Sequence, residues 1–231
     1  MRKPRLLLAD DHAIFLEGLT RLLEPEFEVA GRAEDGRQML EMSARLKPEV
    51  IVADISMPLL SGIEAVRQLR RKDSRTKVIF LSMHSDVELA SEAIRLGASG
   101  YVLKHSAAES LSRAIHEVLK GRVYVSPRIS VDVLSSVQQT SRQQDRPALV
   151  LTQREREVLQ LVAEGRTIRG IANILEIAGR TVVFHKSNLM DKLGLRTTAE
   201  LTCYALQSGL LMAPQPVVFD HPTLAARAAH S

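Results

Sequence analysis

The chain has 231 residues, a length that is large for one small domain and comfortable for two. Its apolar fraction of 45% and charged fraction of 25% are ordinary globular values and exclude a chain that is disordered throughout. The net charge of +4 arises beyond residue 120, because residues 1–120 carry 18 basic and 18 acidic side chains. So small an excess favours a polyanionic partner for the C-terminal half only weakly.

The sequence lacks the marks of a secreted or membrane protein. Cys203 is the single cysteine, which excludes a disulfide framework and predicts a reducing compartment. Asp10 and Asp11 interrupt the first apolar run too early for a signal peptide, and no stretch approaches the ~20 apolar residues of a membrane span. We therefore expect a soluble cytoplasmic protein that makes no membrane contact.

Short apolar runs alternate with amphipathic segments along the first 120 residues. Strands are expected at 5–9, 28–33, 49–53, 77–81 and 99–103, and helices at 13–23, 36–46, 62–71, 87–96 and 107–119. Most of the runs lack the in–out alternation of a half-exposed sheet, which is typical of strands buried on both faces. Five strand–helix units predict a parallel sheet covered on both faces, with functional residues beyond the carboxyl ends of its strands.

The rest of the chain changes character. Residues 135–147 are polar without a period and are typical of a linker. Beyond them the periodicity is only helical: Thr152 and Glu155 form a capping-box pattern that begins a helix, and further helices are expected at 167–175, 180–193 and 197–208. Two short helices joined by a tight turn suit a helix-turn-helix. The tail from Ala213 contains three prolines and has little periodicity.

Acidic residues follow two of the expected strands. Asp10 and Asp11 come directly after the first strand, and Asp54 comes directly after the third. These strands lie side by side in a doubly wound sheet, so three carboxylates converge and repel one another unless a cation neutralises them. Oxygen ligands of this kind suit Mg²⁺. His12 and His84 flank the same edge and could be metal ligands, although ordinary loop histidines are the favoured interpretation.

A hydroxyl and an ammonium group join this edge. Ser82 ends the fourth strand and Lys104 follows the fifth. An isolated Asp or Lys after a strand is usually a cap or a solvated charge, but their coincidence at four strand ends favours a phosphoryl-accepting site. There Asp54 would attack as a nucleophile, the cation and Lys104 would neutralise the incoming oxygens, and Ser82 would bond the new phosphoryl group.

The motifs at these strand ends resemble those of a response-regulator receiver domain. They are Leu8-Ala-Asp-Asp-His12, Asp54-Ile-Ser-Met-Pro58, Leu81-Ser-Met83 and Gly100-Tyr-Val-Leu-Lys104. The resemblance covers about residues 3–120 and implies a flavodoxin-like sheet of five parallel strands in the order 2-1-3-4-5.

The resemblance also implies roles for individual residues. Asp54 is the phosphoacceptor; Asp11 and Asp54 bind Mg²⁺ directly, Asp10 binds it through water, and Ser56 offers its backbone carbonyl.

Ser82 and Tyr101 are the implied switch pair, in which the hydroxyl moves toward the phosphoryl group and the ring follows it inward. A partly buried strand residue is an equally open interpretation of Tyr101. Relatives often have Arg where this chain has Leu16, which is expected to pack instead.

Motifs in the C-terminal half look like those of the LuxR-type DNA-binding domain. They are Leu151-Thr-Gln-Arg-Glu-Arg-Glu-Val-Leu159, Val162-Ala-Glu-Gly165 and Arg196-Thr-Thr-Ala-Glu-Leu201. Together the two halves resemble the NarL/FixJ class of response regulators. This implies an all-α domain of four helices, with DNA-facing residues Arg180, Thr181, Phe184, His185, Lys186 and Ser187, and a dimer contact through Leu201, Tyr204 and Ala205.

The resemblance divides the chain into a receiver domain (1–121), a linker (122–147), a helix-turn-helix domain (148–212) and a C-terminal tail (213–231). Three departures weaken the DNA-binding half. Relatives usually have a charged residue where this chain has Val183, often have Glu where it has Gly170, and commonly have a capping Ser where it has Ala178. A domain less stable than its relatives is expected.

Our leading hypothesis is a phosphorylation-controlled transcription factor. A sensor histidine kinase would phosphorylate Asp54 with Mg²⁺, the receiver would stop masking the recognition helix, and homodimers would bind double-stranded DNA. The second hypothesis is a phosphoreceiver that acts through protein partners with weakened DNA binding.

An enzyme is the third hypothesis. A phosphohydrolase resembling the haloacid dehalogenases needs an acid two residues after its aspartyl nucleophile, where this chain has Ser56. A nucleotide-binding site is not favoured either, because neither GxGxxG nor GxxxxGK[ST] follows the first strand. We therefore expect a regulator and not an enzyme.

Overall fold

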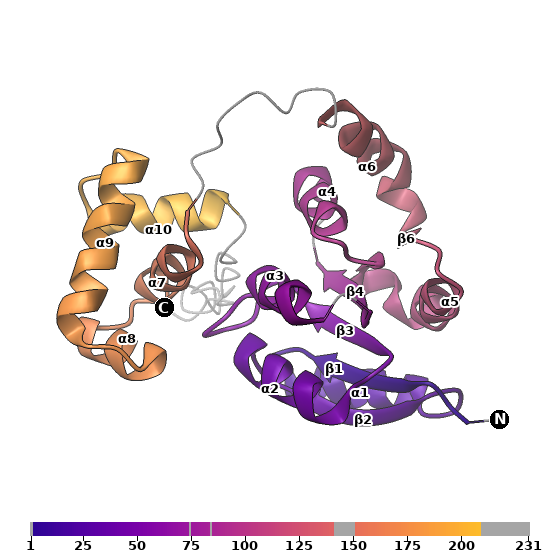
Figure 1. Ribbon diagram of the computed structural model, residues 1–231. Coiled ribbons are helices and arrows are strands. Elements are labelled where there is room, and N and C mark those ends of the chain that lie inside the picture. Colours follow the sequence, from indigo (N-terminus) through magenta and orange to yellow (C-terminus); the bar gives the residue numbers. More distant parts are fainter. Residues whose placement is uncertain (1, 74, 84, 141–150, 209–231) are drawn as a thin grey trace, which may run out of the picture.

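The computed structural model describes residues 2–73, 75–83, 85–140 and 151–208 and forms two domains (Figure 1). The N-terminal domain contains β1 (Arg5–Ala9), α1 (Ala13–Leu23), β2 (Glu28–Ala33), α2 (Gly36–Leu46), β3 (Val50–Asp54), α3 (Gly62–Lys72), β4 (Lys77–Ser82), α4 (Val87–Arg95), β5 (Gly100–Leu103), a short 3₁₀ turn (Lys104–Ser106), α5 (Ala107–Leu119), β6 (Tyr124–Val125) and α6 (Pro127–Thr140). The C-terminal domain contains α7 (Gln153–Ala163), α8 (Ile168–Leu175), α9 (Gly179–Leu193) and α10 (Thr198–Gln207).

The strands form one parallel sheet in the order β2-β1-β3-β4-β5-β6. The predicted order of the first five strands is confirmed, and the prediction of only five strands is wrong. β6 adds a sixth by pairing Tyr124 with Gly100 and Val125 with Tyr101. A strand of two residues is too short to produce the apolar run by which the others were recognised.

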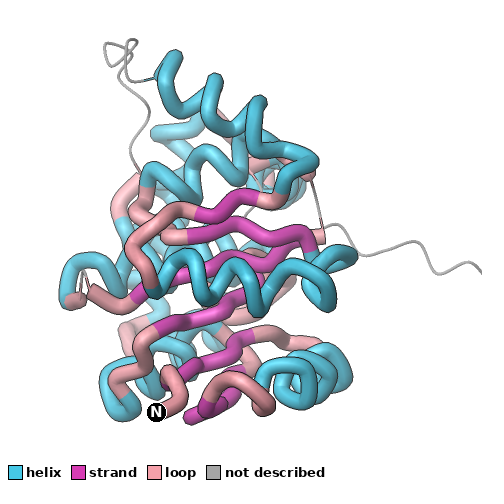
Figure 2. Tube along the Cα trace, turned by 90° about the vertical axis from the view of Figure 1, so that its right-hand side faces the viewer, coloured by secondary structure: helices cyan, strands magenta, loops and turns pink. Residues whose placement is uncertain are grey.

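Helices cover both faces of the sheet (Figure 2). Leu7, Ile51 and Phe80 pack against α2, α3, α4 and α6 on one face, whereas Leu6 and Val52 pack against α1 and α5 on the other. Consecutive strand residues therefore enter two separate cores. This explains why the strands are continuous apolar runs and why the predicted two-sided burial holds.

The polar segment after α5 is more ordered than its composition indicates. The sequence predicted a linker without regular structure over 135–147, but α6 continues to Thr140, and residues 141–150 lie outside the described residues. Ile129 and Val133 of α6 are buried against α4 and the sheet edge, and the Ser126 N–H donates to the Tyr101 carbonyl at 2.9 Å. Only one side of α6 is apolar, so its average composition hides it. The tail from Ala213 also lies outside the described residues.

The C-terminal domain is the expected bundle of four helices around a core of its own. Thr152 and Glu155 form the predicted capping box at the start of α7. At α8, the Thr167 hydroxyl accepts from the Gly170 N–H at 3.1 Å, but glycine cannot return the second bond of a capping box. Ala178, the residue before α9, makes no side-chain cap bond.

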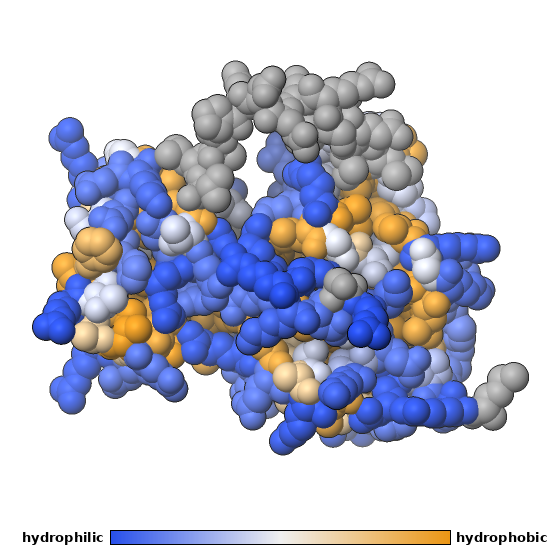
Figure 3. Space-filling view, viewed as in Figure 1, coloured by the Kyte–Doolittle hydropathy of each residue, from blue (hydrophilic) through white to orange (hydrophobic). Residues whose placement is uncertain are grey.

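No helix among the described residues is long and apolar enough to cross a membrane. The visible surface over α3 and toward the C-terminal domain is mostly hydrophilic (Figure 3). The two domains meet there, where α7 lies against α3 and the loop of residues 55–61 that precedes it.

Candidate functional site

The carboxyl edge of the sheet brings the acidic residues together. Asp54 is the last residue of β3. Asp10 directly follows β1, the strand that pairs with β3 in the sheet. Ligand atoms of Asp10, Asp11, His12 and Asp54 all lie within 4.8 Å of one another. Asp10 and Asp54 are buried, whereas Asp11 is exposed. Strand packing thus forces two carboxylates into the protein interior beside a third at its surface.

Lys104 is the cation that the chain itself supplies to this cluster. Its Nζ lies 2.7 Å from Asp10 Oδ2 and 3.0 Å from Asp54 Oδ2, and its side chain is only 8% exposed. Nζ also stands 4.9 Å from the ring centre of Phe15. Burial alone would lower the pKa of Lys104, but the carboxylates of Asp54 and Asp10 outweigh it and raise the pKa. Lys104 therefore remains an ammonium ion at neutral pH.

The ionised form of Asp54 is disfavoured even with Lys104 beside it. Burial raises its pKa to about 6, and the neighbouring Asp10 adds to the rise, whereas Lys104 and the Ser56 N–H oppose it. A buried carboxylate whose ionised form is disfavoured gains from any added positive charge. The carboxyl edge of the sheet therefore carries less positive charge than is needed to neutralise its carboxylates.

The donor atoms at this edge fit Mg²⁺. Asp10 Oδ2 already pairs with Lys104, and Asp10 Oδ1 accepts the His12 N–H at 2.9 Å, which leaves Asp11 and Asp54 to offer oxygens. His12 Nδ1 lies 3.0 Å from Asp11 Oδ1 and 3.1 Å from Asp10 Oδ1, so the imidazole joins the cluster as a partner of the acids. Hard carboxylate oxygens beside a solvent-accessible hollow are the ligands that Mg²⁺ prefers. His84 lies outside the described residues.

A hollow of about 1070 Å³ opens directly onto this cluster. Asp54, Ser56 and Lys104 line its floor, and apolar residues of α1 line its wall, including Ile14 and Leu22. Ile14 is 89% exposed and Leu22 is 37% exposed, so the rim is apolar and open to solvent. Leu16, by contrast, packs into the core as expected. The hollow can therefore admit a partner to the buried carboxylate.

Ser82 and Tyr101 lie next to each other on β4 and β5. Both are buried, Ser82 at the carboxyl end of its strand, and their side chains are hydrogen-bonded to each other. Burial raises the pKa of the Tyr101 hydroxyl to about 12, an effect that the bond to Ser82 partly offsets. Tyr101 is fully buried, beyond the partial burial considered from the sequence, and packs in the same core as Ile129 and Val133 of α6.

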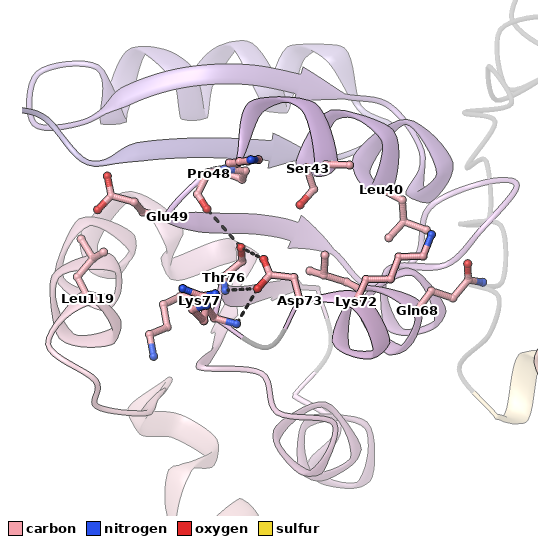
Figure 4. Close-up of a pocket in the computed structure, with 14 residues that line it drawn as sticks. Leu40, Ser43, Pro48, Glu49, Gln68, Lys72, Asp73, Thr76, Lys77 and Leu119 are labelled. Atoms are coloured by element: carbon pink, nitrogen blue, oxygen red, sulfur yellow. Dashed lines mark hydrogen bonds between the residues drawn. The ribbon is translucent and has the colours of Figure 1, made fainter.

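A second hollow, of about 830 Å³, lies at the opposite end of the strands between α2 and α3 (Figure 4). Its hydrogen bonds centre on Asp73 and Thr76: Asp73 accepts from the Thr76 hydroxyl and from the Arg75 N–H, and the Thr76 hydroxyl also approaches the Pro48 carbonyl. The bond from Thr76 lowers the pKa of Asp73. The lining of this hollow contains none of the predicted site residues.

The predicted DNA-facing residues lie along α9. Arg180, Phe184 and Ser187 are exposed, whereas Thr181, His185 and Lys186 are half-buried. Lys186 Nζ donates to the Thr198 hydroxyl at 2.9 Å, which ties α9 to the start of α10. The ring of Phe184 contacts that of His185 edge to face, and Val183 beside it is 52% exposed.

The structure corrects the expectation that the receiver masks the recognition helix. α9 lies on the side of its domain away from the sheet, and Phe184 is 60% exposed (Figure 1). α7 contacts the receiver instead, because it carries the polar side chains that pair with α3 and the loop before it.

The predicted dimer contact also needs correction. Leu201 and Ala205 are fully buried in the core of their own domain, where α10 packs against α7. They therefore cannot form a contact between chains while the domain is folded. Tyr204 is half-buried at the edge of that core.

Sequence reasoning missed the contact between the domains. Gln160 is 1% exposed and Glu64 is 2% exposed, and each is bonded to the other domain. The available signal was Gln160 itself, a polar residue within the apolar run 158–162. A glutamine at a core position indicates a buried hydrogen-bond partner, but the sequence does not say which.

Comparisons with known proteins match both halves of the chain. The response regulator receiver domain family matches residues 6–116, and the luxR family of bacterial regulatory proteins matches residues 149–205. The transcriptional regulatory protein DegU of Brevibacillus brevis is 33% identical over 223 residues, covering 90% of this chain and 94% of that protein. The transcriptional regulatory protein MctR of Rhizobium johnstonii is 38% identical over 211 residues, covering 90% and 96%.

Solved structures of the RcsB response regulator are similar to this chain over both domains. One from Salmonella typhimurium has a TM-score of 0.60 and 28% identity, covering 90% of this chain and 99% of that one. An RcsB–DNA complex has a TM-score of 0.55 and 27% identity, covering 90% and 100%.

Proposed function

Because the chain belongs to the response regulators that join a receiver domain to a LuxR-type DNA-binding domain, we propose that it is a transcriptional regulator controlled by phosphorylation of Asp54. One observation carries the proposal: Asp54, Asp10, Asp11 and Lys104 meet at one end of the sheet beside an open hollow. The proposed units are a receiver domain that extends beyond the predicted 1–121, because β6 and α6 pack onto it as far as Thr140, a DNA-binding domain over 148–212 and a tail over 213–231; the predicted linker over 122–147 is thus structured up to Thr140.

At the proposed site, Asp54 acts as the nucleophile. One carboxylate oxygen bonds to phosphorus while the bond from phosphorus to the donor's leaving group breaks, which gives an acyl phosphate. Lys104, 3.0 Å from Asp54 Oδ2, neutralises the phosphoryl oxygens as they arrive. Asp11, Asp54 and the Ser56 carbonyl would hold Mg²⁺ directly and Asp10 would hold it through water, and the ion would supply further positive charge.

Ser82 and Tyr101 are the residues proposed to respond. The Ser82 hydroxyl, at the end of β4 and bonded to Tyr101, would turn from Tyr101 toward the new phosphoryl group. Tyr101 would then lose its hydroxyl partner within a core that includes α6. The roles of this pair fit a regulator, and Ser56, where an aspartyl hydrolase needs an acid, argues against an enzyme.

A sensor histidine kinase is the proposed donor. A phosphohistidine on a partner protein must come within bonding distance of Asp54, and the hollow beside α1 is the open approach to it. Ile14 and Leu22 at its rim, with Met83 at 52% exposure, offer the apolar contacts that a protein partner buries.

Double-stranded DNA is the proposed partner of α9, through Arg180, Thr181, Phe184, His185, Lys186 and Ser187. The exposure of α9 supports this role, since the helix can enter a major groove without first leaving the receiver. A homodimer on DNA remains part of the proposal. Of its predicted contact, only Tyr204 can take part, and the remaining surface would come from the exposed side of α10.

A second function is favoured by one observation. Val183 and Phe184 form an exposed apolar pair in the N-terminal half of α9, which suits a protein partner better than a phosphate backbone. Steep loss of duplex DNA binding between low and moderate salt would favour the transcriptional role, because each neutralised phosphate releases counterions. Binding that is weak and insensitive to salt would favour a regulator acting through protein partners.

The test of the receiver assignment is labelling by a small phosphodonor. The full chain is incubated with acetyl phosphate with Mg²⁺ or with a chelator, and phosphate is located by intact mass. We expect one phosphoryl group in the wild type with Mg²⁺ and none in Asp54→Asn or with the chelator. Equal labelling of Asp54→Asn would refute the proposal.

A further inference from the structure

The loop that follows the phosphoacceptor is bonded to the DNA-binding domain on both sides of its turn. Gln160 of α7 accepts from the Ser61 N–H at 2.8 Å and donates to the Met57 carbonyl at 2.9 Å. These are the backbone groups on either side of the turn at Pro58–Leu60, and Gln160 is 1% exposed. A single side chain from the other domain therefore spans the loop.

The middle of the loop also depends on the DNA-binding domain. The Leu59 N–H donates to Glu164 at 3.0 Å, and the Leu59 side chain packs against the C-terminal core. Leu59 has a φ of +63°, in the left-handed region that branched side chains rarely adopt. Such a conformation persists where its surroundings fix it, and here those surroundings belong to α7 and its domain.

The loop is held tightly where it lies against the end of β3. The Gly62 N–H donates to the Ile55 carbonyl at 2.8 Å, which closes the loop at the end of β3. A Cβ on Gly62 would stand 2.0 Å from the Asp54 carbonyl oxygen, so the loop rests directly on the phosphoacceptor's backbone. A change of loop conformation is therefore transmitted to Asp54 and to Ser56.

Other contacts keep α7 in place without touching the loop. Arg156 pairs with Glu64 at 2.5 Å, Gln68 donates to Glu157 at 2.9 Å, and Arg71 donates to Gln153 at 2.5 Å. These residues join α7 to α3, so domain docking and loop geometry are carried by different side chains. That separation makes the role of Gln160 testable.

We propose that Gln160 is a positioning residue for the phosphorylation site, through which the DNA-binding domain sets the conformation of loop 55–61. The inference rests on the proposed function of Asp54. Because coupling between two sites is reciprocal, the state of Asp54 must alter the docking of α7 by the same free energy by which docking alters Asp54. The signal thus has a direct route through α7, besides any route through Ser82 and Tyr101.

The test compares Gln160→Leu with Gln153→Leu in the full chain. Gln160→Leu keeps the size of the side chain and removes both loop bonds, whereas Gln153→Leu removes a contact to α3 and leaves the loop bonds intact. Hydrogen exchange at the Leu59 and Ser61 amides is measured without metal or phosphodonor. We expect faster exchange at Ser61 in Gln160→Leu and wild-type exchange in Gln153→Leu.

The second readout is the Mg²⁺ concentration that gives half-maximal labelling of Asp54 by acetyl phosphate. We expect Gln160→Leu to raise it at least about fivefold, the low end of the effect of losing its two loop bonds, and Gln153→Leu to leave it unchanged. Glu164→Ala, which removes the Leu59 bond at the end of α7, should shift it in the same direction by less and replaces Gln160→Leu if that variant does not fold.

The outcomes separate the two proposals. A wild-type chain that is not labelled at Asp54 refutes the proposed function. A labelled wild type with the same Mg²⁺ requirement in Gln160→Leu and Glu164→Ala, despite faster Ser61 exchange, refutes the positioning role alone. Unchanged Ser61 exchange in Gln160→Leu shows that α7 does not hold the loop and also overturns the inference.

Discussion

The receiver and the DNA-binding domain place their charged residues in opposite surroundings. In the receiver, Lys104 is 8% exposed and lies between two buried carboxylates. In the DNA-binding domain, Lys186 is half-exposed, and its Nζ bonds only a threonine hydroxyl among the described residues. A buried charge is held in one place by the surrounding fold, which compensates the cost of its desolvation. A surface charge stays hydrated and can bind a ligand. The two regions should therefore respond very differently to equivalent substitutions.

The largest effect is expected at Lys104. Lys104→Met keeps the length of the side chain but leaves Asp10 and Asp54 facing each other without a cation, at a cost of about 3–5 kcal/mol in the free energy of unfolding. Urea unfolding at pH 7 measures it. Added Mg²⁺ should restore part of the loss, because it supplies the missing positive charge. A loss below about 1 kcal/mol would mean that the ion pairs do not stabilise this edge.

Asp54→Asn should change the free energy of unfolding in the opposite direction and stabilise the protein. The folded pKa of about 6 lies above the ~3.9 of an unfolded aspartate, so the ionised carboxylate destabilises the fold above pH 6. That cost disappears as the pH falls from 6 toward 4, where the wild type is protonated in the folded state. We expect the variant to be about 1–3 kcal/mol more stable at pH 7 with a chelator present.

The pH dependence supplies the control for this effect. The difference in unfolding free energy between Asp54→Asn and the wild type should shrink when both are measured near pH 4.5. A gain that is equal at both pH values would show that the amide stabilises the site for a reason other than the removed charge.

Smaller effects are expected at the helix ends of the DNA-binding domain. Ala178 has extended backbone angles (φ −67°, ψ 144°) at the N-cap of α9 and makes no cap bond. Ala178→Ser should therefore stabilise the domain by about 1 kcal/mol, seen as a rise in its melting temperature. Thr197→Ala, which removes an existing cap from α10, is the matched control and should lower the melting temperature by a similar amount.

Gly170→Glu tests the same interpretation at α8. It would complete a capping box with Thr167 and remove a glycine from the helix, for a gain of about 0.5–1 kcal/mol. A Cβ at this position would lie 3.3 Å from the Thr167 hydroxyl, so that side chain must shift slightly. No rise in melting temperature would show that this contact offsets the gain.

The contrast between the regions also explains what the sequence could predict. Buried strands have a local signature, and the carboxyl ends of parallel strands meet whatever the loops do, so Asp10, Asp54 and Lys104 could be brought together from their spacing alone. β6 and α6 were missed because two strand residues and a one-sided helix leave almost no local pattern.

Surface roles were harder to predict because they depend on which side of a helix the partner occupies. Leu201 and Ala205 have the period of an apolar face, and that face packs on α7 inside the domain instead of on a second chain. The bonds of Gln160 to the loop join residues that are 99 and 103 positions apart. No local rule connects such residues; their pairing appears only when the two domains are placed side by side.

The smallest effect on stability is expected at Lys186, where the comparison with Lys104 is sharpest. Lys186→Met removes one half-exposed hydrogen bond to Thr198, so the free energy of unfolding should change by less than about 0.5 kcal/mol. If α9 binds duplex DNA and Lys186 neutralises a phosphate, the slope of log affinity against log salt should fall by about 1. Lys120→Met, on the receiver, is the control and should leave that slope unchanged. A large loss of stability in Lys186→Met would assign this lysine to the fold, and an unchanged slope would remove it from the DNA-facing set.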